Sequence, residues 1–216
     1  MGKRQEAAKL TREKIVQAAK KLHEERGLSN VSVDEIVAEA SVSKGSFYVY
    51  FKRREDVASE IAFRRFGALK ESLEQFPGTA AVKLGQFLTE SVRYIEEQGL
   101  PICKEWMKSA VSPNGEDNSG MAKLDFDRDF ILKTILSAKE NGEISVDAPA
   151  ESLANMILAE YYGCVTMWSM TDGSFPMLMC IEQFADTLSE MLKPWTDTVP
   201  PTRRKNCRGR LPSGMF

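Results

Sequence analysis

The stretch "VSVDEIVAEASVSKGSFYVYF", residues 31–51, contains two helix starts one after the other. Ser32 is placed as an N-cap, and Glu35, three residues later, completes a capping box for the first helix. Ser43 is the N-cap of a second helix, which is expected to run to about Tyr50. The link "ASVS" between them is too short for anything other than a tight turn. The segment therefore predicts two short, well-capped helices that are tightly joined.

The second of these helices has two unlike faces. Phe47, Tyr50 and Phe51 follow helical spacing and are expected to pack against the preceding helices. A further amphipathic helix is expected from about Thr11 to Gly27, so the segment completes a three-helix helix-turn-helix unit whose third helix is shaped to enter a major groove. The free face of that third helix carries small, basic and aromatic side chains: Lys44, Gly45, Ser46, Tyr48 and Val49.

Charge is distributed unevenly along the 216 residues, although the net charge is only -2. Residues 1–54 carry twelve Lys and Arg against seven acidic side chains, and the tail after Asp197 adds five basic residues. Residues 55–202 therefore hold an excess of twelve acidic side chains. This distribution indicates that the basic residues 1–54, the head of the chain, bind a polyanion. The acidic residues 55–202, called the body below, are expected to have a different role.

Other function classes find little support in the composition. The four cysteines lack a CxxC pair and His23 is the only histidine, so neither a disulfide framework nor a metal site is expected. Nothing resembles a nucleophile with its base, a phosphate loop or a cofactor motif, so no enzyme activity and no cofactor are expected. No apolar run approaches the length that spans a bilayer, which predicts a cytoplasmic protein without a membrane partner.

The body is expected to be helical as well, because apolar residues recur at spacings of three and four and strand signals are nearly absent. Asp147 and Ser174 are placed as caps, and Gly142 as a stop. The chain is thus predicted to be all-α, with about nine helices in three parts: a helix-turn-helix domain over 1–53, a helical domain over 54–195 and a basic, disordered tail over 196–216. The expected body helices span about 54–75, 79–98, 102–111, 121–142, 147–170 and 174–195.

Residues 11–57, "TREKIVQAAKKLHEERGLSNVSVDEIVAEASVSKGSFYVYFKRREDV", resemble the DNA-binding domain of the TetR family of bacterial transcriptional regulators. The resemblance implies a homodimer on a palindromic operator in double-stranded DNA, a helical effector domain and dimerisation through the last two long helices. Two positions depart from the family pattern. Arg53 replaces a small polar cap, which leaves the capping of the next helix open, and Val49 replaces a larger residue, which leaves base preference open.

Carried over position by position, the resemblance implies that the start of the third helix contacts bases and phosphates. It also implies that Tyr48 and Tyr50 touch the backbone, and that Arg54 stands where a phosphate-binding lysine is usual. The physical chemistry agrees, because basic side chains and tyrosyl hydroxyls bind phosphate oxygens and small residues allow close approach. The expected DNA-binding residues are Ser32, Ser43, Lys44, Gly45, Ser46, Tyr48, Val49, Tyr50 and Arg54.

Soft and aromatic side chains in the body are the type that lines an adaptable pocket for a small apolar or amphipathic effector. Each of them is equally consistent with plain core or a dimer interface. Glu160 lies within the apolar run "MILAEYYGC", where a buried carboxylate needs a basic partner or a cationic or hydroxylated ligand. The expected pocket residues are Trp106, Met107, Phe126, Phe130, Met156, Glu160, Tyr161, Cys164 and Trp168.

Cys103 offers an alternative switch. It follows the "QGLP" break at the start of a helix and precedes Lys104, and both features favour the thiolate. A plain, partly buried thiol is the other interpretation of this residue. The sequence therefore favours a homodimeric repressor that a small molecule releases from its operator, with a thiol-based sensor of oxidants or electrophiles acting through Cys103 as the alternative. A helical interaction module without DNA binding is a further alternative, which the complete groove-facing set disfavours.

Overall fold

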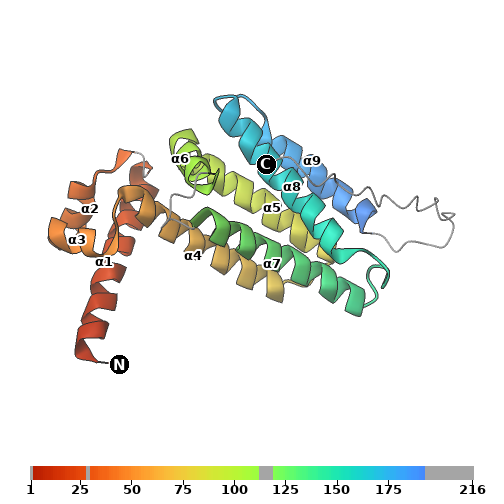
Figure 1. The fold of residues 1–216 in the computed structure, drawn as a ribbon, viewed down its shortest axis with the longest axis horizontal. Helices are drawn as coiled ribbons and strands as arrows, with labels where there is room; N and C mark the ends of the chain where they lie inside the picture. Colours follow the sequence, from red (N-terminus) through yellow and green to blue (C-terminus); the bar gives the residue numbers. More distant parts are fainter. Residues whose placement is uncertain (1, 28–29, 112–118, 193–216) are drawn as a thin grey trace, which may run out of the picture.

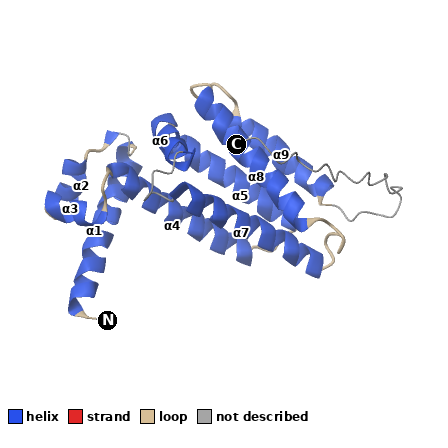
Figure 2. Ribbon diagram, viewed as in Figure 1, coloured by secondary structure: helices blue, strands red, loops and turns tan. Residues whose placement is uncertain are grey.

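The computed structural model describes residues 2–27, 30–111 and 119–192. Every regular element within these ranges is helical (Figure 2), which confirms the all-α prediction. No helix there combines the length and apolar character needed to cross a bilayer. The helices are α1 (Lys3–Arg26), α2 (Val33–Glu39), α3 (Lys44–Tyr50), α4 (Arg54–Gln75), α5 (Ala80–Gln98), α6 (Leu100–Val111), α7 (Ser119–Glu140), α8 (Ala150–Met170) and α9 (Met177–Met191).

The helices form two groups that α4 connects. Helices α1, α2 and α3 lie together at one end of the molecule, and helices α5, α7, α8 and α9 lie alongside one another at the other end (Figure 1). Helix α4 begins beside the first group and continues along the second. The basic tail predicted for 196–216 falls outside the described residues.

The first group has its own hydrophobic core. Ile15 of α1, Ile36 of α2 and Phe47 of α3 are completely buried in it, as the apolar spacing predicted. Val57 and Ile61, from the first turns of α4, belong to the same core. Since burying one such side chain contributes roughly 1.5–3 kcal/mol, the beginning of α4 is a structural part of the helix-turn-helix unit.

The caps of α2 and α3 confirm the two helix starts read from the sequence. The Ser32 hydroxyl accepts a hydrogen bond from the Glu35 N–H at 3.2 Å, and the Glu35 carboxylate accepts one from the Ser32 N–H at 2.8 Å. The hydrogen bond from the Ser32 backbone helps to lower the pKa of Glu35 to about 2, so the capping box persists well into the acid range. Ser43 Oγ accepts from the Ser46 N–H at 3.0 Å.

Helix α1 differs from its prediction, because it begins at Lys3 and not near Thr11. The residues before Thr11 include Ala, Lys, Glu, Gln and Leu, which have high helix propensity and extend the helix toward its N-terminus. Thr11 lies inside the helix, where its hydroxyl donates to the Ala7 carbonyl at 2.9 Å. The predicted end is confirmed, since Gly27 takes a positive φ of 77° and its N–H donates to the His23 carbonyl.

The second group packs around α5. Leu84, Phe87, Leu88 and Val92 of this helix are completely buried. Gly85 lies where α5 meets α9, and a Cβ atom there would lie only 3.1 Å from the Cβ of Ala185. A side chain at position 85 would therefore push the two helices apart.

Two predicted caps in this group are wrong. Helices α8 and α9 follow Pro149 and Pro176, and not Asp147 and Ser174. A proline has a fixed φ close to that of a helix and loses nothing by lacking an N–H at a helix start. The Ser174 hydroxyl instead donates to the Thr171 carbonyl at 2.8 Å within the preceding turn.

We expect Ser32→Ala to lower the free energy of unfolding by about 1 kcal/mol, because it removes the acceptor for the Glu35 N–H at the start of α2. Urea denaturation followed by circular dichroism measures the change. Ser152→Ala, at an exposed position inside α8, is the matched control and should leave the midpoint almost unchanged. Equal losses in both variants would contradict the capping role of Ser32.

Candidate functional site

Helix α3 presents the face that its sequence predicted. Phe47 is turned into the core, whereas Tyr48 is 51% exposed and Val49 is 73% exposed. Ser43, Lys44 and Gly45 are exposed as well, and Ser46 and Tyr50 are half-buried. A surface of small, basic and aromatic side chains on one short helix is therefore open to a partner.

Lys44 has an internal partner on this surface. Its ammonium lies 2.7 Å from the Asp34 carboxylate of α2, which raises the pKa of Lys44 and keeps the side chain charged. The pair is exposed to solvent, where an ion pair contributes only about 0–1 kcal/mol. A phosphate or a guanine edge can therefore replace Asp34 at small cost.

The start of α4 is fixed by backbone contacts. The Arg54 guanidinium donates to the Val31 carbonyl at 3.0 Å and to the Glu55 carboxylate at 3.0 Å, and its side chain is 28% exposed. The phosphate contact expected of Arg54 stays a prediction, because these contacts hold its guanidinium against the protein itself. Asp56 supplies the cap that Arg53 lacks, since its carboxylate accepts from the N–H groups of Lys52 at 2.7 Å and Arg53 at 3.0 Å.

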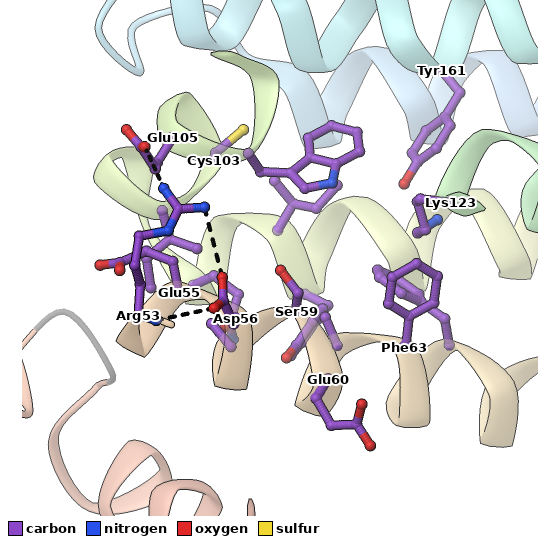
Figure 3. A pocket seen from close by; sticks show the side chains of 18 residues that line it. Arg53, Glu55, Asp56, Ser59, Glu60, Phe63, Cys103, Glu105, Lys123 and Tyr161 are labelled. Carbon is purple, nitrogen blue, oxygen red and sulfur yellow. Dashed lines mark hydrogen bonds and ion pairs between the residues drawn. The ribbon is translucent and has the colours of Figure 1, made fainter. Parts of the chain in front are cut away.

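A cavity of about 340 Å³ lies in the second group, beside α4. Its lining comes mainly from α4, α5 and α6, together with Lys123 of α7 and Tyr161 of α8 (Figure 3). Arg53 and Glu105 lie at one end in this view, and Lys123 and Tyr161 at the other. The wall is mostly apolar and includes Phe63, Phe66, Tyr94, Ile95, Ile102 and Trp106. This composition is typical of a small-molecule site.

Of the nine residues predicted to line an effector pocket, Trp106 and Tyr161 line this cavity. Phe130, Cys164 and Trp168 are buried in the core, where the Phe130 and Phe87 rings make a tilted contact with their centroids 4.5 Å apart. Met107 and Phe126 are half-buried against the same core. Met156 and Glu160 are exposed, so the expectation of a buried Glu160 is wrong. Ile157, Leu158 and Tyr161 of the same run are buried, so the run is apolar on both its buried and its exposed side.

The inner end of the cavity holds a buried ion pair that the sequence reading missed. Lys123 binds the Asp127 carboxylate, with 2.6 Å to its Oδ2, and the Tyr162 hydroxyl donates to the same oxygen at 2.8 Å. Burial lowers the pKa of Lys123 and raises that of Asp127, while their mutual attraction opposes both shifts. The Lys123 ammonium also lies 4.0 Å from the centre of the Phe66 ring. The spacing of Lys123 and Asp127, one helical turn apart, is the signal that could have revealed the pair.

Tyr94 brings a second polar group to the cavity. Its side chain is 2% exposed, and its hydroxyl has no hydrogen-bond partner among the described residues. Burial raises the pKa of Tyr94 to about 12, so the hydroxyl keeps its proton. The ring is held between Phe66, in an edge contact with centroids 5.4 Å apart, and the Arg65 guanidinium, 4.3 Å from the ring centre.

Cys103 lines the cavity, but its surroundings do not favour a thiolate. The thiol is buried and lies 3.3 Å from the Ser169 hydroxyl, and burial raises its pKa. Lys104, expected to stabilise the thiolate, pairs with Asp172 instead. The expectation of a lowered Cys103 pKa is therefore wrong, and the thiol-switch alternative loses its physical basis.

His23 connects the two groups of helices. It is half-buried, and its Nε2 lies 2.9 Å from the side-chain nitrogen of Gln98. Gln98 ends α5 and lines the cavity. The end of α1 therefore contacts a residue of the cavity wall.

Comparison with known proteins agrees with this arrangement. Residues 15–61 match the sequence pattern described as bacterial regulatory proteins, tetR family. Over 202 residues the chain is 33% identical to the HTH-type transcriptional regulator AcrR of Shigella flexneri, covering 88% of this chain and 92% of that protein. The chain belongs to the TetR family. The resemblance read from residues 11–57 is thereby confirmed.

Other proteins match this chain over most of their length. The HTH-type transcriptional repressor DhaR of Mycobacterium sp. (strain GP1) is 24% identical over 198 residues, which cover 87% of this chain and 95% of DhaR. The solved structure of Thermus thermophilus FadR, a TetR-family repressor in complex with lauroyl-CoA, superposes with a TM-score of 0.62 at 21% identity. That match covers 88% of this chain and 98% of the FadR chain. An N-terminal helix-turn-helix followed by a larger helical domain is thus shared.

The buried pair makes a double-mutant prediction. Asp127→Leu should lower the free energy of unfolding by about 3–5 kcal/mol, because it leaves the Lys123 ammonium buried without its counter-ion. Adding Lys123→Met should recover most of that loss, since two apolar side chains replace the pair. Urea denaturation of the single and double variants measures both changes. A double variant no more stable than Asp127→Leu alone would show that the unpaired charge is not the cause.

Proposed function

We propose that this TetR-family protein is a homodimeric repressor that binds a palindromic operator through α3 and is released by a small molecule in the cavity beside α4. The single observation that carries the proposal is the position of α4. Val57 and Ile61 on one side of this helix belong to the core of the DNA-binding unit. Ser59 and Phe63, on another side of the same turns, line the cavity.

This shared helix gives an effector a physical route to the DNA. A ligand that needs more room than the cavity offers displaces α4, and the core around Val57 carries α1, α2 and α3 with it. Ion pairs strengthen the connection, because Arg12 binds Glu60 at 2.8 Å and Arg64 binds Glu13 at 2.8 Å, each linking α1 to α4. The contact between His23 and Gln98 adds a second link from the cavity wall to α1. Such a shift changes the separation of two recognition helices and weakens the fit to two half-sites.

Exposed apolar side chains on α8 and α9 support the dimer. Met156, Met167 and Met170 of α8 and Met179 of α9 are each about half exposed or more. A second copy of the chain would cover these side chains in a four-helix interface with a two-fold axis. The same axis would place two α3 helices on the two halves of a palindrome. A repressor acting on the genome in this way works in the cytoplasm.

The DNA-binding part of the proposal predicts the effect of Lys44→Ala. We expect about tenfold or greater loss of operator affinity, because one base or phosphate contact contributes about 1–3 kcal/mol. Fluorescence anisotropy on the intergenic DNA upstream of the protein's own gene measures the affinity, and light scattering on the same samples reports the dimer.

Lys133→Ala is the matched control for this measurement. Lys133 is an exposed lysine of α7 that pairs with Glu74, so its loss removes the same charge far from α3. The control should bind the operator at wild-type strength. Operator binding by Lys44→Ala at wild-type strength, or a purified protein that remains monomeric on the DNA, would refute the proposal.

A further inference from the structure

Hydrogen-bond donors from three different helices line the cavity: Tyr94 of α5, Lys123 of α7 and Tyr161 of α8. Lys123 and Tyr161 lie together at the end remote from Arg53, with the Tyr161 hydroxyl directed toward Lys123 (Figure 3). Both tyrosines are kept protonated by burial, which raises the pKa of each. Each of the three side chains can therefore donate a proton in a hydrogen bond at neutral pH.

Of the three donors, the Tyr94 hydroxyl most clearly lacks a hydrogen-bond acceptor. Only 2% of Tyr94 is exposed, and its hydroxyl is buried without a hydrogen-bond partner within the described ranges. Buried hydroxyls almost always have a partner, because an unsatisfied one has lost its bonds to water without replacement. A ligand oxygen in the cavity would supply the missing acceptor.

The charges around the cavity indicate whether the ligand oxygen is anionic or neutral. Lys123 donates to both oxygens of Asp127 and has one N–H left, so the pair is already neutral as a whole. A ligand carboxylate there would place two negative groups around one buried ammonium, which is unfavourable in a desolvated site. The four carboxylates of the lining are also paired with arginines: Glu55 with Arg54, Asp56 and Glu105 with Arg53, and Glu60 with Arg12 and Arg64. An anionic ligand would have to compete with these carboxylates or with Asp127 for a cation, so a neutral acceptor is favoured.

The side chains that line the cavity indicate the shape of the apolar part of the ligand. Five aromatic side chains, from four helices, line a cavity of about 340 Å³: Phe63, Phe66, Tyr94, Trp106 and Tyr161. Aromatic rings pack on one another in stacked or edge contacts, so these walls fit flat rings better than a long flexible chain. The cavity lies at the small end of the range for small-molecule sites.

We infer that the effector is an uncharged aromatic compound with a hydrogen-bond-accepting oxygen, of the aromatic ketone type, whose oxygen accepts from the Tyr94 hydroxyl. This inference rests on the proposed function, because it names the ligand class of the same cavity. Lys123 and Tyr161 provide further donors at the inner end, and the aromatic walls hold the rings.

Three matched probes test the chemistry on the full-length dimer by isothermal titration calorimetry. Benzophenone has two rings and a ketone oxygen, diphenylmethane has the rings without the oxygen, and diphenylacetate carries a negative charge on the same rings. We expect benzophenone to bind about tenfold more tightly than diphenylmethane, because it satisfies the buried hydroxyl, and diphenylacetate to bind most weakly.

Tyr94→Phe removes only the hydroxyl and keeps the ring. It should abolish the advantage of benzophenone over diphenylmethane while leaving the affinity for diphenylmethane unchanged. Ser152→Ala removes a hydroxyl at an exposed position of α8, outside the cavity lining, and should alter neither affinity. Equal binding of ketone and hydrocarbon by the unmodified protein would overturn the inference. Tightest binding of the anion, binding of none of the probes, or an unchanged ketone advantage in Tyr94→Phe would overturn it as well.

Anisotropy of operator DNA with the same benzophenone solutions keeps the two proposals apart. Ketone binding that depends on Tyr94 but leaves the operator bound supports the inferred ligand chemistry and contradicts release by a ligand in this cavity. Release of the operator by diphenylacetate alone supports effector control and overturns the inferred ligand class.

Discussion

Helix α4 contributes side chains to two separate hydrophobic cores, and its single backbone must fit the packing of both. Its first turns bury Val57 and Ile61 among α1, α2 and α3, and further along Phe66 and Leu73 are buried within the larger domain. An α-helix transmits displacement along its length because its backbone hydrogen bonds resist bending. Two ion pairs between α1 and α4 add to this coupling: Arg12 of α1 binds Glu60 of α4, and Arg64 of α4 binds Glu13 of α1. The orientation of the DNA-binding unit relative to the larger domain is therefore set by how the cavity side of α4 is packed.

The cavity combines an apolar wall with polar groups whose burial costs free energy of hydration. Lys123 and Asp127 are removed from water together, and their pairing with each other and with the Tyr162 hydroxyl offsets the loss of hydration. Because this pair is internally neutral, it fixes a strongly polar end to the cavity without giving it a net charge. The aromatic ring of Phe66 lies against both the Lys123 ammonium and the Tyr94 ring, so one apolar side chain holds two of the donors in place.

Local signals predicted the DNA-binding unit well. The caps at Ser32 and Ser43 and the stop at Gly27 depend on residues within one or two helical turns, so the sequence alone specified them. The larger domain was predictable as helices but not as a site, because its cavity depends on how five helices pack. Lys123 and Asp127 were not singled out from the sequence, because their burial depends on the same packing. Glu160 shows the opposite error, because its apolar neighbours in the sequence predicted a buried carboxylate. Several of those neighbours face the core, whereas the Glu160 carboxylate faces outward.

The pair between Lys44 and Asp34 bears on how the protein searches a chromosome. An ammonium that already holds a carboxylate gains less from any passing phosphate, because the internal partner must first be given up. Random DNA offers only that phosphate, whereas a correct half-site also offers base edges in the groove. In the proposed complex with DNA, Asp34 would therefore compete with the phosphates of unrelated sequence for Lys44, and even the roughly 0–1 kcal/mol of an exposed ion pair would shorten the time spent on such sequence.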